Sequence, residues 1–185
     1  MKSGKGHKLV KARRYRYCPW CASPLESRDF DGRQRLSCPS CNFIWYRNPI
    51  PAAGAILDRD KKVLLVKRKF PPRIGHWCFP AGFMEYNESP VECCRREVQE
   101  ETGLQIKIGR LFWNYAGHDD PRSNAVLAIY LTEIVGGELS PGDDASEVEF
   151  FDLEKIPSNI AFQAHRDAIL DYRRFVESGL FPGER

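Results

Sequence analysis

The chain has 185 residues, which is enough for one ordinary domain and a small additional module. Its formal net charge is +3, but residues 1–16 carry seven basic side chains and no acidic one, so the rest of the chain is mildly acidic. No apolar run approaches the length of a membrane-spanning helix, and no hydrophobic segment follows the basic start as a secretory signal would require. We therefore expect a soluble, cytoplasmic protein.

The basic segment at residues 1–16 is predicted to be a flexible tail that precedes the folded modules. A short basic arm can contact RNA or acidic surfaces, although a solubilising role is the commoner explanation for such a composition. Nucleic acid is therefore a minor candidate partner.

Two Cys-x2-Cys pairs stand near the start of the chain and are separated by 16 residues. This spacing is typical of a tetrahedral zinc site on the opposing turns of a zinc ribbon, with Gly32 marking a hairpin between short strands. A cytoplasmic setting disfavours disulfides, and a redox pair would not need a second copy. Because four cysteines leave no open ligand position, the zinc is expected to be structural, in a module at residues 17–46. The predicted Zn²⁺ ligands are Cys18, Cys21, Cys38 and Cys41.

After a linker at residues 46–49, two apolar stretches at residues 52–57 and 63–66 flank a polar turn and predict a hairpin. A loop and a short strand at residues 77–79 then lead into Pro80-Ala81-Gly82. Later in the chain we expect strands at residues 104–116, 124–135 and 147–152 and a terminal helix at residues 160–177. Strands around one central helix, closed by a terminal helix, predict an α/β sandwich.

The central helix is predicted from its terminal residues. Ser89 is a good N-cap, Pro90 suits the first helical position, and Glu92 completes a capping box. Gly103 is a typical C-terminal stop.

At helical spacing, Val91, Cys94 and Val98 share an apolar face, and a cluster of glutamates lies on the neighbouring arc. Such a cluster could be a solvated face with i,i+4 ion pairs. Alternatively, several carboxylates on one rigid flank could hold Mg²⁺ or Mn²⁺, hard ions that commonly bridge substrate phosphates. The glutamates concerned are Glu97, Glu100 and Glu101.

Residues 82–104 fill every defined position of the pattern G-x5-E-x7-R-E-U-x-E-E-x-G-U, where U is a bulky aliphatic residue. This stretch resembles the Nudix box, and nine specified positions at fixed spacing make chance a poor explanation. The resemblance implies a Nudix α/β/α sandwich with a mixed sheet at residues 47–185. It also implies metal-dependent hydrolysis of a nucleoside diphosphate linked to another group, X.

The resemblance assigns roles to residues in and around the box. Glu97, Glu100 and Glu101 are the implied metal ligands and candidate bases, and the backbone carbonyl of Ala81 is a further ligand. Arg96 and Glu88 look like the pair that orients these glutamates. A distant loop often supplies one more carboxylate in this family, and Glu147 is the candidate, with a plain strand-end acid as the alternative.

The identity of X depends on features outside the box. The zinc ribbon, the Tyr-Arg-Asn-Pro linker and Trp77-Cys-Phe-Pro-Ala-Gly82 are similar to FAD and ADP-ribose pyrophosphatases. NADH pyrophosphatases share the ribbon, but their Ser-Gln-Pro-Trp marker is absent after the box. We therefore expect FAD or ADP-ribose as substrate, with AMP as one product. The candidate substrate-binding residues are Arg68, Phe112, Trp113, Tyr115 and Phe162.

Two alternatives stay open. One is an NADH pyrophosphatase or a processor of NAD-capped RNA, in which the basic tail and the ribbon hold a transcript and binding falls steeply with salt. The other is a non-catalytic sensor of a nucleotide sugar, against which the complete set of glutamates argues. Resemblance to these pyrophosphatases also implies a homodimer.

Overall fold

The computed structural model describes residues 15–142 and 144–184. The chain divides into two compact units, Met1–Pro49 and Ile50–Arg185. Most of the basic segment expected to be a tail lies outside the described residues. Within the part of the chain that the structure describes, no helix is long and apolar enough to cross a membrane.

The first unit is a three-stranded antiparallel sheet. Strands β1 (Glu26–Phe30) and β2 (Arg33–Ser37) form the predicted hairpin, and β3 (Ile44–Trp45) pairs with β2. Gly32 has a φ of 79°, a conformation that suits glycine, so the hairpin turns where the sequence predicted. The Sγ atoms of the four predicted ligand cysteines all lie within 4.8 Å of one another. This clustering is what a tetrahedral zinc site requires.

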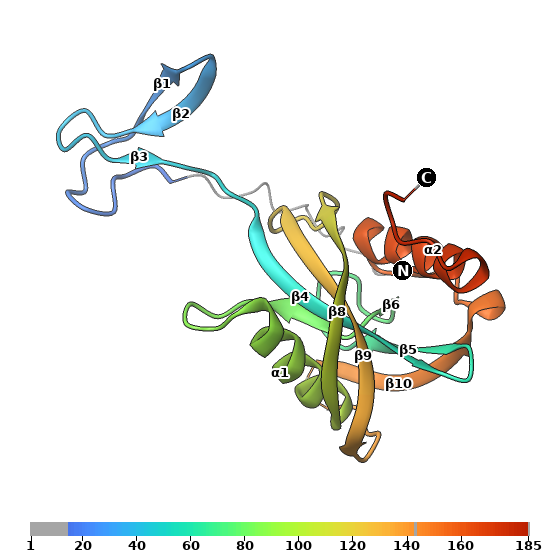
Figure 1. Cartoon of the computed structure of the whole chain (residues 1–185). Coiled ribbons are helices and arrows are strands. Elements are labelled where there is room, and N and C mark those ends of the chain that lie inside the picture. Colours follow the sequence, from blue (N-terminus) through green and yellow to red (C-terminus); the bar gives the residue numbers. More distant parts are fainter. Residues whose placement is uncertain (1–14, 143, 185) are drawn as a thin grey trace, which may run out of the picture. The chain divides into compact units, whose positions relative to one another are not determined.

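The second unit is built on a mixed sheet (Figure 1). Its main path runs in the order β10-β5-β4-β9-β8, with β4 and β9 parallel and the other neighbours antiparallel. These strands are β4 (Ile50–Arg59), β5 (Lys62–Arg68), β8 (Leu104–Gly117), β9 (Ala125–Gly137) and β10 (Ala145–Asp152).

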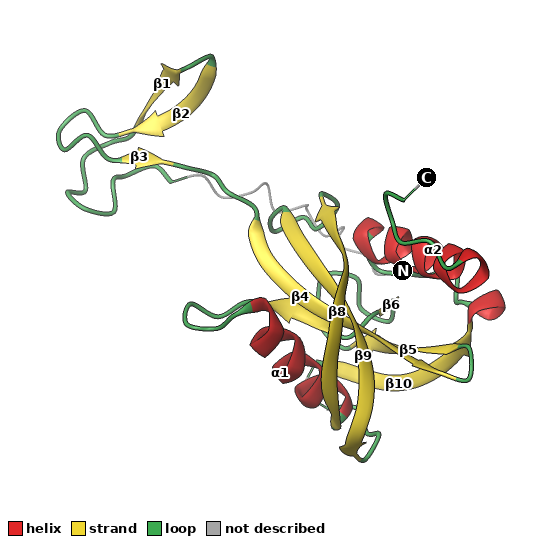
Figure 2. Ribbon diagram, in the orientation of Figure 1, coloured by secondary structure: helices red, strands yellow, loops and turns green. Residues whose placement is uncertain are grey.

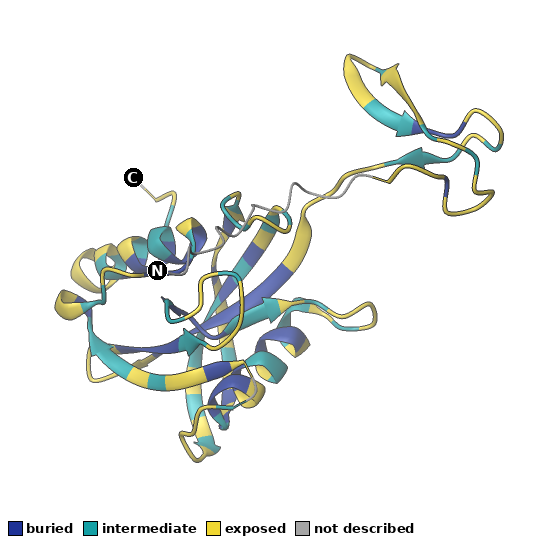
Figure 3. Ribbon diagram, turned by 180° about the vertical axis from the view of Figure 1, so that it is seen from behind, coloured by how far each residue is buried: buried dark blue, intermediate teal, exposed yellow. Residues whose placement is uncertain are grey.

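Helices α1 (Pro90–Thr102) and α2 (Gln163–Ser178) cover opposite faces of this sheet (Figure 2). A short 3-10 helix, η1 (Leu153–Lys155), precedes α2. Strand β4 is buried on both faces, because Ala53 and Leu57 pack into the core with α1 while Ala52 and Ile56 pack into the core with α2. Figure 3 shows this strand as one of the most buried parts of the chain. The predicted α/β/α sandwich is confirmed.

Helix α1 begins and ends at the predicted residues. The Ser89 hydroxyl accepts a hydrogen bond from the Glu92 N–H, and the Glu92 carboxylate accepts one from the Ser89 N–H. Gly103 ends the helix at a φ of 71°. The buried face is shifted from the predicted one, since Cys93 is buried beside Cys94 and Val98.

Strands β4 and β5 pair only beside their connecting turn, at Asp58↔Val63 and Arg59↔Lys62. Farther from the turn they diverge, and each takes a different short partner: β7 (Ala81–Phe83) pairs with β4, and β6 (Trp77–Cys78) pairs with β5. The divergence brings the segment before α1 into the sheet. It therefore places the predicted site residues of the loop against the glutamates of the helix.

Helix α2 begins at Gln163, later than the predicted start at residue 160, because Ile160 forms a parallel bridge with Trp77. Its N-cap residue, Phe162, has no side-chain oxygen to accept the first helical N–H groups. The carboxylate of Asp119 supplies the acceptor instead, at 3.0 Å from the Gln163 nitrogen. A loop distant in sequence therefore fixes the start of this helix.

Replacement of Gly103 by alanine is expected to destabilise the second unit. A Cβ there would lie 2.5 Å from the carbonyl oxygen of Glu138, in addition to the strain of a positive φ. We expect a loss of roughly 1–3 kcal/mol in unfolding free energy, measured by urea denaturation. Gly179→Ala is the matched control, because Gly179 has a φ of 74° with nothing within 4 Å. Equal losses in the two variants would show that the Glu138 contact costs nothing.

Candidate active site

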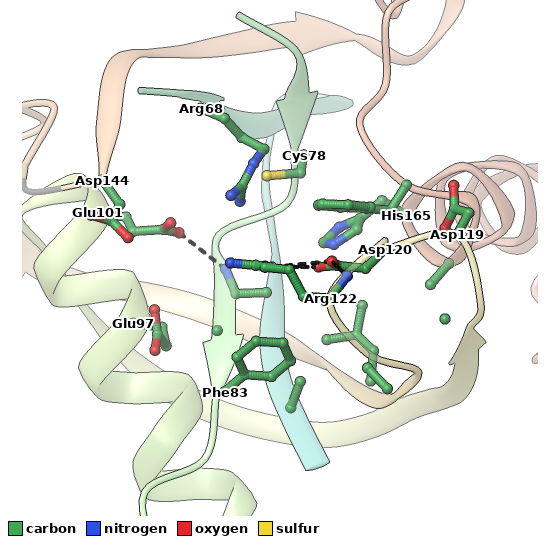
Figure 4. A pocket seen from close by; sticks show the side chains of 18 of the residues that line it. Arg68, Cys78, Phe83, Glu97, Glu101, Asp119, Asp120, Arg122, Asp144 and His165 are labelled. Atoms are coloured by element: carbon green, nitrogen blue, oxygen red, sulfur yellow. Dashed lines mark hydrogen bonds and ion pairs between the residues drawn. The ribbon is translucent and has the colours of Figure 1, made fainter. Parts of the chain in front are cut away.

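A cavity of about 320 Å³ lies where β4 and β5 diverge, and Figure 4 shows the side chains that line it. Carboxylates of α1 form one side, with Glu97 and Glu101 among the lining residues. Arg68 and Cys78 lie between that side and His165, which belongs to the opposite wall (Figure 4). The cavity thus combines an acidic end at α1 with an opposite wall that carries both charged and aromatic side chains.

The glutamates of α1 occupy different environments. Glu101 is only 6% exposed, and its Oε2 accepts a hydrogen bond from the Ala81 N–H at 3.1 Å. Glu97 lies so close to β7 that a Cβ at Gly82 would be 2.1 Å from its Oε1, so a side chain there would displace the Glu97 carboxylate. Glu100 is exposed and is not among the residues that line the cavity. The structure brings Glu97, Glu101 and Ala81 together, with Glu100 at the margin.

Arg96 connects these glutamates to the loop before the helix. Its guanidinium donates to Glu88 at 2.6 Å and 3.1 Å, to Glu97 at 2.7 Å and to Glu100 at 3.0 Å. It also donates to the backbone oxygen of Phe83 at 3.1 Å. The predicted pairing of Arg96 with Glu88 is therefore present. The hydrogen bonds from Arg96 hold the pKa of Glu88 at about 2.

Two of the carboxylates resist ionisation. Burial, together with the nearby charge of Glu97, raises the pKa of Glu101 to about 8. Burial also raises the pKa of Glu97. Crowded carboxylates of this kind are stabilised by a cation placed between them, and oxygen donors suit a hard divalent ion. The residues present therefore fit the Mg²⁺ or Mn²⁺ that the sequence predicts.

Two further carboxylates line the cavity near α1. Asp144 precedes β10, close enough for its charge to raise the pKa of Glu101, and Glu85 lies in the loop before the helix. Glu147, the sequence-based candidate for an additional carboxylate, is not a lining residue. It points from β10 to Lys67, at 2.9 Å, because the irregular register between Ala145 and Glu147 sets its direction. Asp144 is thus the better placed of the two acids.

The predicted substrate-binding residues separate into two groups. Arg68 and Phe162 line the cavity, with the guanidinium 5.3 Å from the ring centroid. Phe112 and Tyr115 are buried in the core beneath α2, where the Tyr115 hydroxyl donates to Asp171. Trp113 is 45% exposed on β8 and does not line the cavity. Phe112 and Tyr115 are therefore core residues and not part of the cavity, which corrects the prediction that they bind substrate.

The sequence did not single out several residues that line the far side of the cavity. Asp120 and Arg122 form an ion pair at 2.7 Å, in the connection between the strands predicted at residues 104–116 and 124–135. Asp119 binds Arg166 of α2 at 3.1 Å. No sequence pattern pointed to His165 as a site residue, because a single histidine in an amphipathic helix is not distinctive.

The NUDIX domain family matches residues 48–172, and the family described as Nudix N-terminal, a zinc ribbon, matches residues 16–47. The chain belongs to the Nudix family. Its Nudix domain carries the cavity described above, and its ribbon carries the four clustered cysteines.

Several known proteins resemble this Nudix hydrolase. An ADP-ribose pyrophosphatase of Methanocaldococcus jannaschii is 42% identical over 131 residues, which are 70% of this chain and 76% of that protein. The NAD-capped RNA hydrolase NudC of Chromobacterium violaceum is 31% identical over 77% of this chain, which spans only 52% of that protein's length. The crystal structure of a NUDIX hydrolase from Nitrosomonas europaea superposes with a TM-score of 0.77 at 32% identity, covering 89% of this chain and 94% of that one. These relatives support hydrolysis of a nucleotide pyrophosphate bond as the activity.

Glu101→Gln should abolish turnover and yet stabilise the metal-free protein. The pKa of Glu101 is about 8 in the folded protein, above its ordinary value of 4.5. The protonated carboxyl therefore contributes fully to the free energy of unfolding below pH 4.5, and this contribution is lost as the pH rises through 8. Glutamine keeps an acceptor for the Ala81 N–H without a charge.

The difference in melting temperature between Glu101→Gln and wild type, measured in a chelator, should therefore grow from pH 5 to about pH 8. Glu133→Gln, a change in an exposed strand residue, is the control. A constant difference across this range would contradict the burial of an ionisable carboxyl at residue 101.

Proposed function

We propose that this Nudix hydrolase cleaves the pyrophosphate bond of an adenine nucleotide linked to X, with ADP-ribose or FAD as the preferred substrate. The observation that carries the proposal is that the half-buried Glu97 and the buried Glu101 line the same cavity as Arg68. A diphosphate needs metal-binding oxygens for one phosphate and a cation for the charge of the other. The cavity offers both.

Mg²⁺ or Mn²⁺ bound at this site would neutralise charge on the phosphate and on the oxygen atoms that enter and leave. Glu97 and Glu101 would hold it, with the Ala81 backbone and Asp144 as further oxygen donors. Arg96 and Glu88 would fix the direction of Glu97 without touching the substrate. Glu100, the third predicted metal ligand, would bind the ion from the rim of the cavity, where Arg96 donates a hydrogen bond to it.

The residues of the chain bind and orient the reacting groups. A water oxygen forms a bond to one phosphorus as the bond from that phosphorus to the bridging oxygen breaks, and the proton of the water passes to a carboxylate of the cluster. The products from ADP-ribose are AMP and ribose 5-phosphate. The products from FAD are AMP and FMN. Arg68, over the Phe162 ring, is suited to the charge on the leaving phosphate.

The assignment of ADP-ribose or FAD is supported by the 42% identical ADP-ribose pyrophosphatase and by the features around the Nudix box. The NudC relatives favour an NAD-derived substrate, but the chain spans about half of their length. The predicted homodimer is part of the proposal.

A turnover panel tests the substrate assignment. The purified protein receives ADP-ribose, FAD, NADH and a nucleotide sugar, each with Mg²⁺ or Mn²⁺, and released AMP or UMP is quantified. We expect AMP from ADP-ribose or FAD, with loss of about a hundredfold or more in Glu97→Gln, since a ligand of the metal is removed. Faster turnover of NADH than of the other substrates would overturn the assignment.

The same assays test whether Asp144 or Glu147 is the catalytic carboxylate that comes from outside α1. Asp144→Asn is expected to lower kcat about tenfold or more, because Asp144 lines the cavity. Glu147→Gln should stay near wild type, because that side chain pairs with Lys67. The reverse order of effects would restore Glu147 as the additional carboxylate.

The ribbon is proposed to bind one structural Zn²⁺ through its four cysteines. We expect elemental analysis to find one zinc per chain and Cys38→Ser to lose it, because Cys38 is a buried ligand of a closed site. Chelation should change backbone NMR signals of residues 15–49 and leave the cores of the second unit folded, since each unit forms its own contacts. Unfolding of both units on chelation would contradict their independence.

A further inference from the structure

His165 is a buried polar side chain in the first turn of α2. It is 7% exposed, and it lines the cavity on the wall opposite Glu97 and Glu101 (Figure 4). Its Nδ1 accepts a hydrogen bond from the Phe79 N–H at 3.2 Å. Because Nδ1 is an acceptor, the single proton of the neutral ring must reside on Nε2.

The ring is neutral over the working pH range. Burial, helped by the charge of Arg68, lowers the pKa of His165 to about 4. The groups that face it from other elements are Arg68, Asp119 and Arg166, and the two arginines oppose a positive charge while Asp119 favours it. The Nε2–H is consequently a permanent, uncharged donor.

This donor has no acceptor within the part of the protein that the structure describes. Among residues 15–142 and 144–184, the hydrogen bond of His165 is made by Nδ1 alone, and Nε2 is not one of the side-chain atoms sealed from solvent. A donor on a side chain so fully buried normally has a partner, since leaving it unpaired is unfavourable. His165 lines the cavity, so a group that enters the cavity can supply this acceptor in place of water.

The position of Arg68 indicates which kind of group would accept the hydrogen bond from His165. Its guanidinium lies 5.3 Å from the centroid of Phe162, and the Phe162 and His165 rings are 6.0 Å apart, so one aromatic side chain supports both groups. The Arg68 Nε donates to the Pro72 backbone oxygen at 2.9 Å, which fixes the direction of the guanidinium. Arg68 lies between the acidic end of the cavity and His165 (Figure 4), and its charge lowers the pKa of Glu101 and of His165.

We propose that His165 is a substrate-binding residue whose Nε2–H, together with Arg68, binds a phosphoryl oxygen of the phosphate that the α1 glutamates and their metal do not hold. The inference rests on the proposed hydrolase function and deepens it. A diphosphate places its two phosphates next to each other, so a group bound at Glu97 and Glu101 presents its neighbour toward Arg68. A cation and a neutral donor from different elements then complete the subsite.

A pair of substitutions separates this role from a merely structural one. In His165→Asn the side-chain oxygen can replace Nδ1 and accept from the Phe79 N–H, but no donor remains at the Nε2 position. In His165→Gln the amide nitrogen can replace Nε2, while the acceptor for Phe79 is lost. Each variant therefore retains one of the two interactions of the ring.

Three measurements are made on the full-length variants. With the substrate that the wild type cleaves best, His165→Asn should raise KM about tenfold or more with little change in kcat, whereas His165→Gln should retain a KM close to wild type. Isothermal titration with inorganic pyrophosphate, without a divalent ion, should show a similar loss of affinity in His165→Asn and in Arg68→Gln. Thermal melting should show the opposite order, with His165→Gln the less stable of the two histidine variants.

The wild-type protein gives a readout that does not depend on how the variants fold. The side-chain NMR signal of His165 Nε2–H should shift downfield when pyrophosphate is added, while the signals of His76, which is partly exposed, should not. No shift would overturn the proposal, as would wild-type KM and pyrophosphate affinity in a folded His165→Asn. A raised KM with unchanged pyrophosphate affinity would overturn the phosphate assignment in favour of a sugar contact. Failure of the wild type to hydrolyse any nucleotide would defeat the proposed function, whereas the pyrophosphate titration would still test the subsite.

Discussion

The hydrogen bonds of Arg96 are the interaction on which the site depends. One guanidinium contacts Glu88 and the Phe83 backbone on the loop side and Glu97 and Glu100 on the helix side. Because the guanidinium is planar and its donors diverge at fixed angles, it sets the distance between the loop and the helix as well as their alignment. A lysine could supply the charge but not this geometry. The positions of the Glu97 and Glu100 carboxylates therefore depend on that one residue.

The acidic end of the cavity illustrates how a functional site opposes stability. Glu101 is buried beside Glu97, and both carboxyls have raised pKa values for the same reason, the removal of charge from water. A fold selected only for stability would not retain two such groups. In the proposed function a bound divalent cation would supply the opposite charge, and it would do so only when the site is occupied. Gly82 is constrained by the same packing, since a side chain there would collide with Glu97.

The two units of the chain are stabilised in different ways. The Nudix domain buries side chains on both faces of its sheet, and its strands and helices provide separate apolar cores beneath α1 and α2. The ribbon has very few buried side chains, among them Cys18 and Cys38 of its sulfur cluster. So short a segment cannot bury enough apolar surface to fold alone, and the proposed zinc site would supply the missing folding energy. The sequence predicted both the sandwich and the clustering of the four cysteines.

The sequence by itself determined the features that depend on local spacing. The capping box at Ser89, the stop at Gly103, the pairing of Arg96 with Glu88 and the two Cys-x2-Cys turns all depend on residues a few positions apart or on one motif.

Only the tertiary structure decided the rest of the site. Whether Asp144 or Glu147 enters the cavity depends on the irregular register of β10 against β5, and the exclusion of Phe112 and Tyr115 depends on which face of β8 packs beneath α2. His165 joins the site because α2 returns across the sheet to β6 and the Asp119 loop fixes its first turn. Such contacts join segments far apart in the chain, and their direction is set by packing rather than by any pattern that a single segment contains.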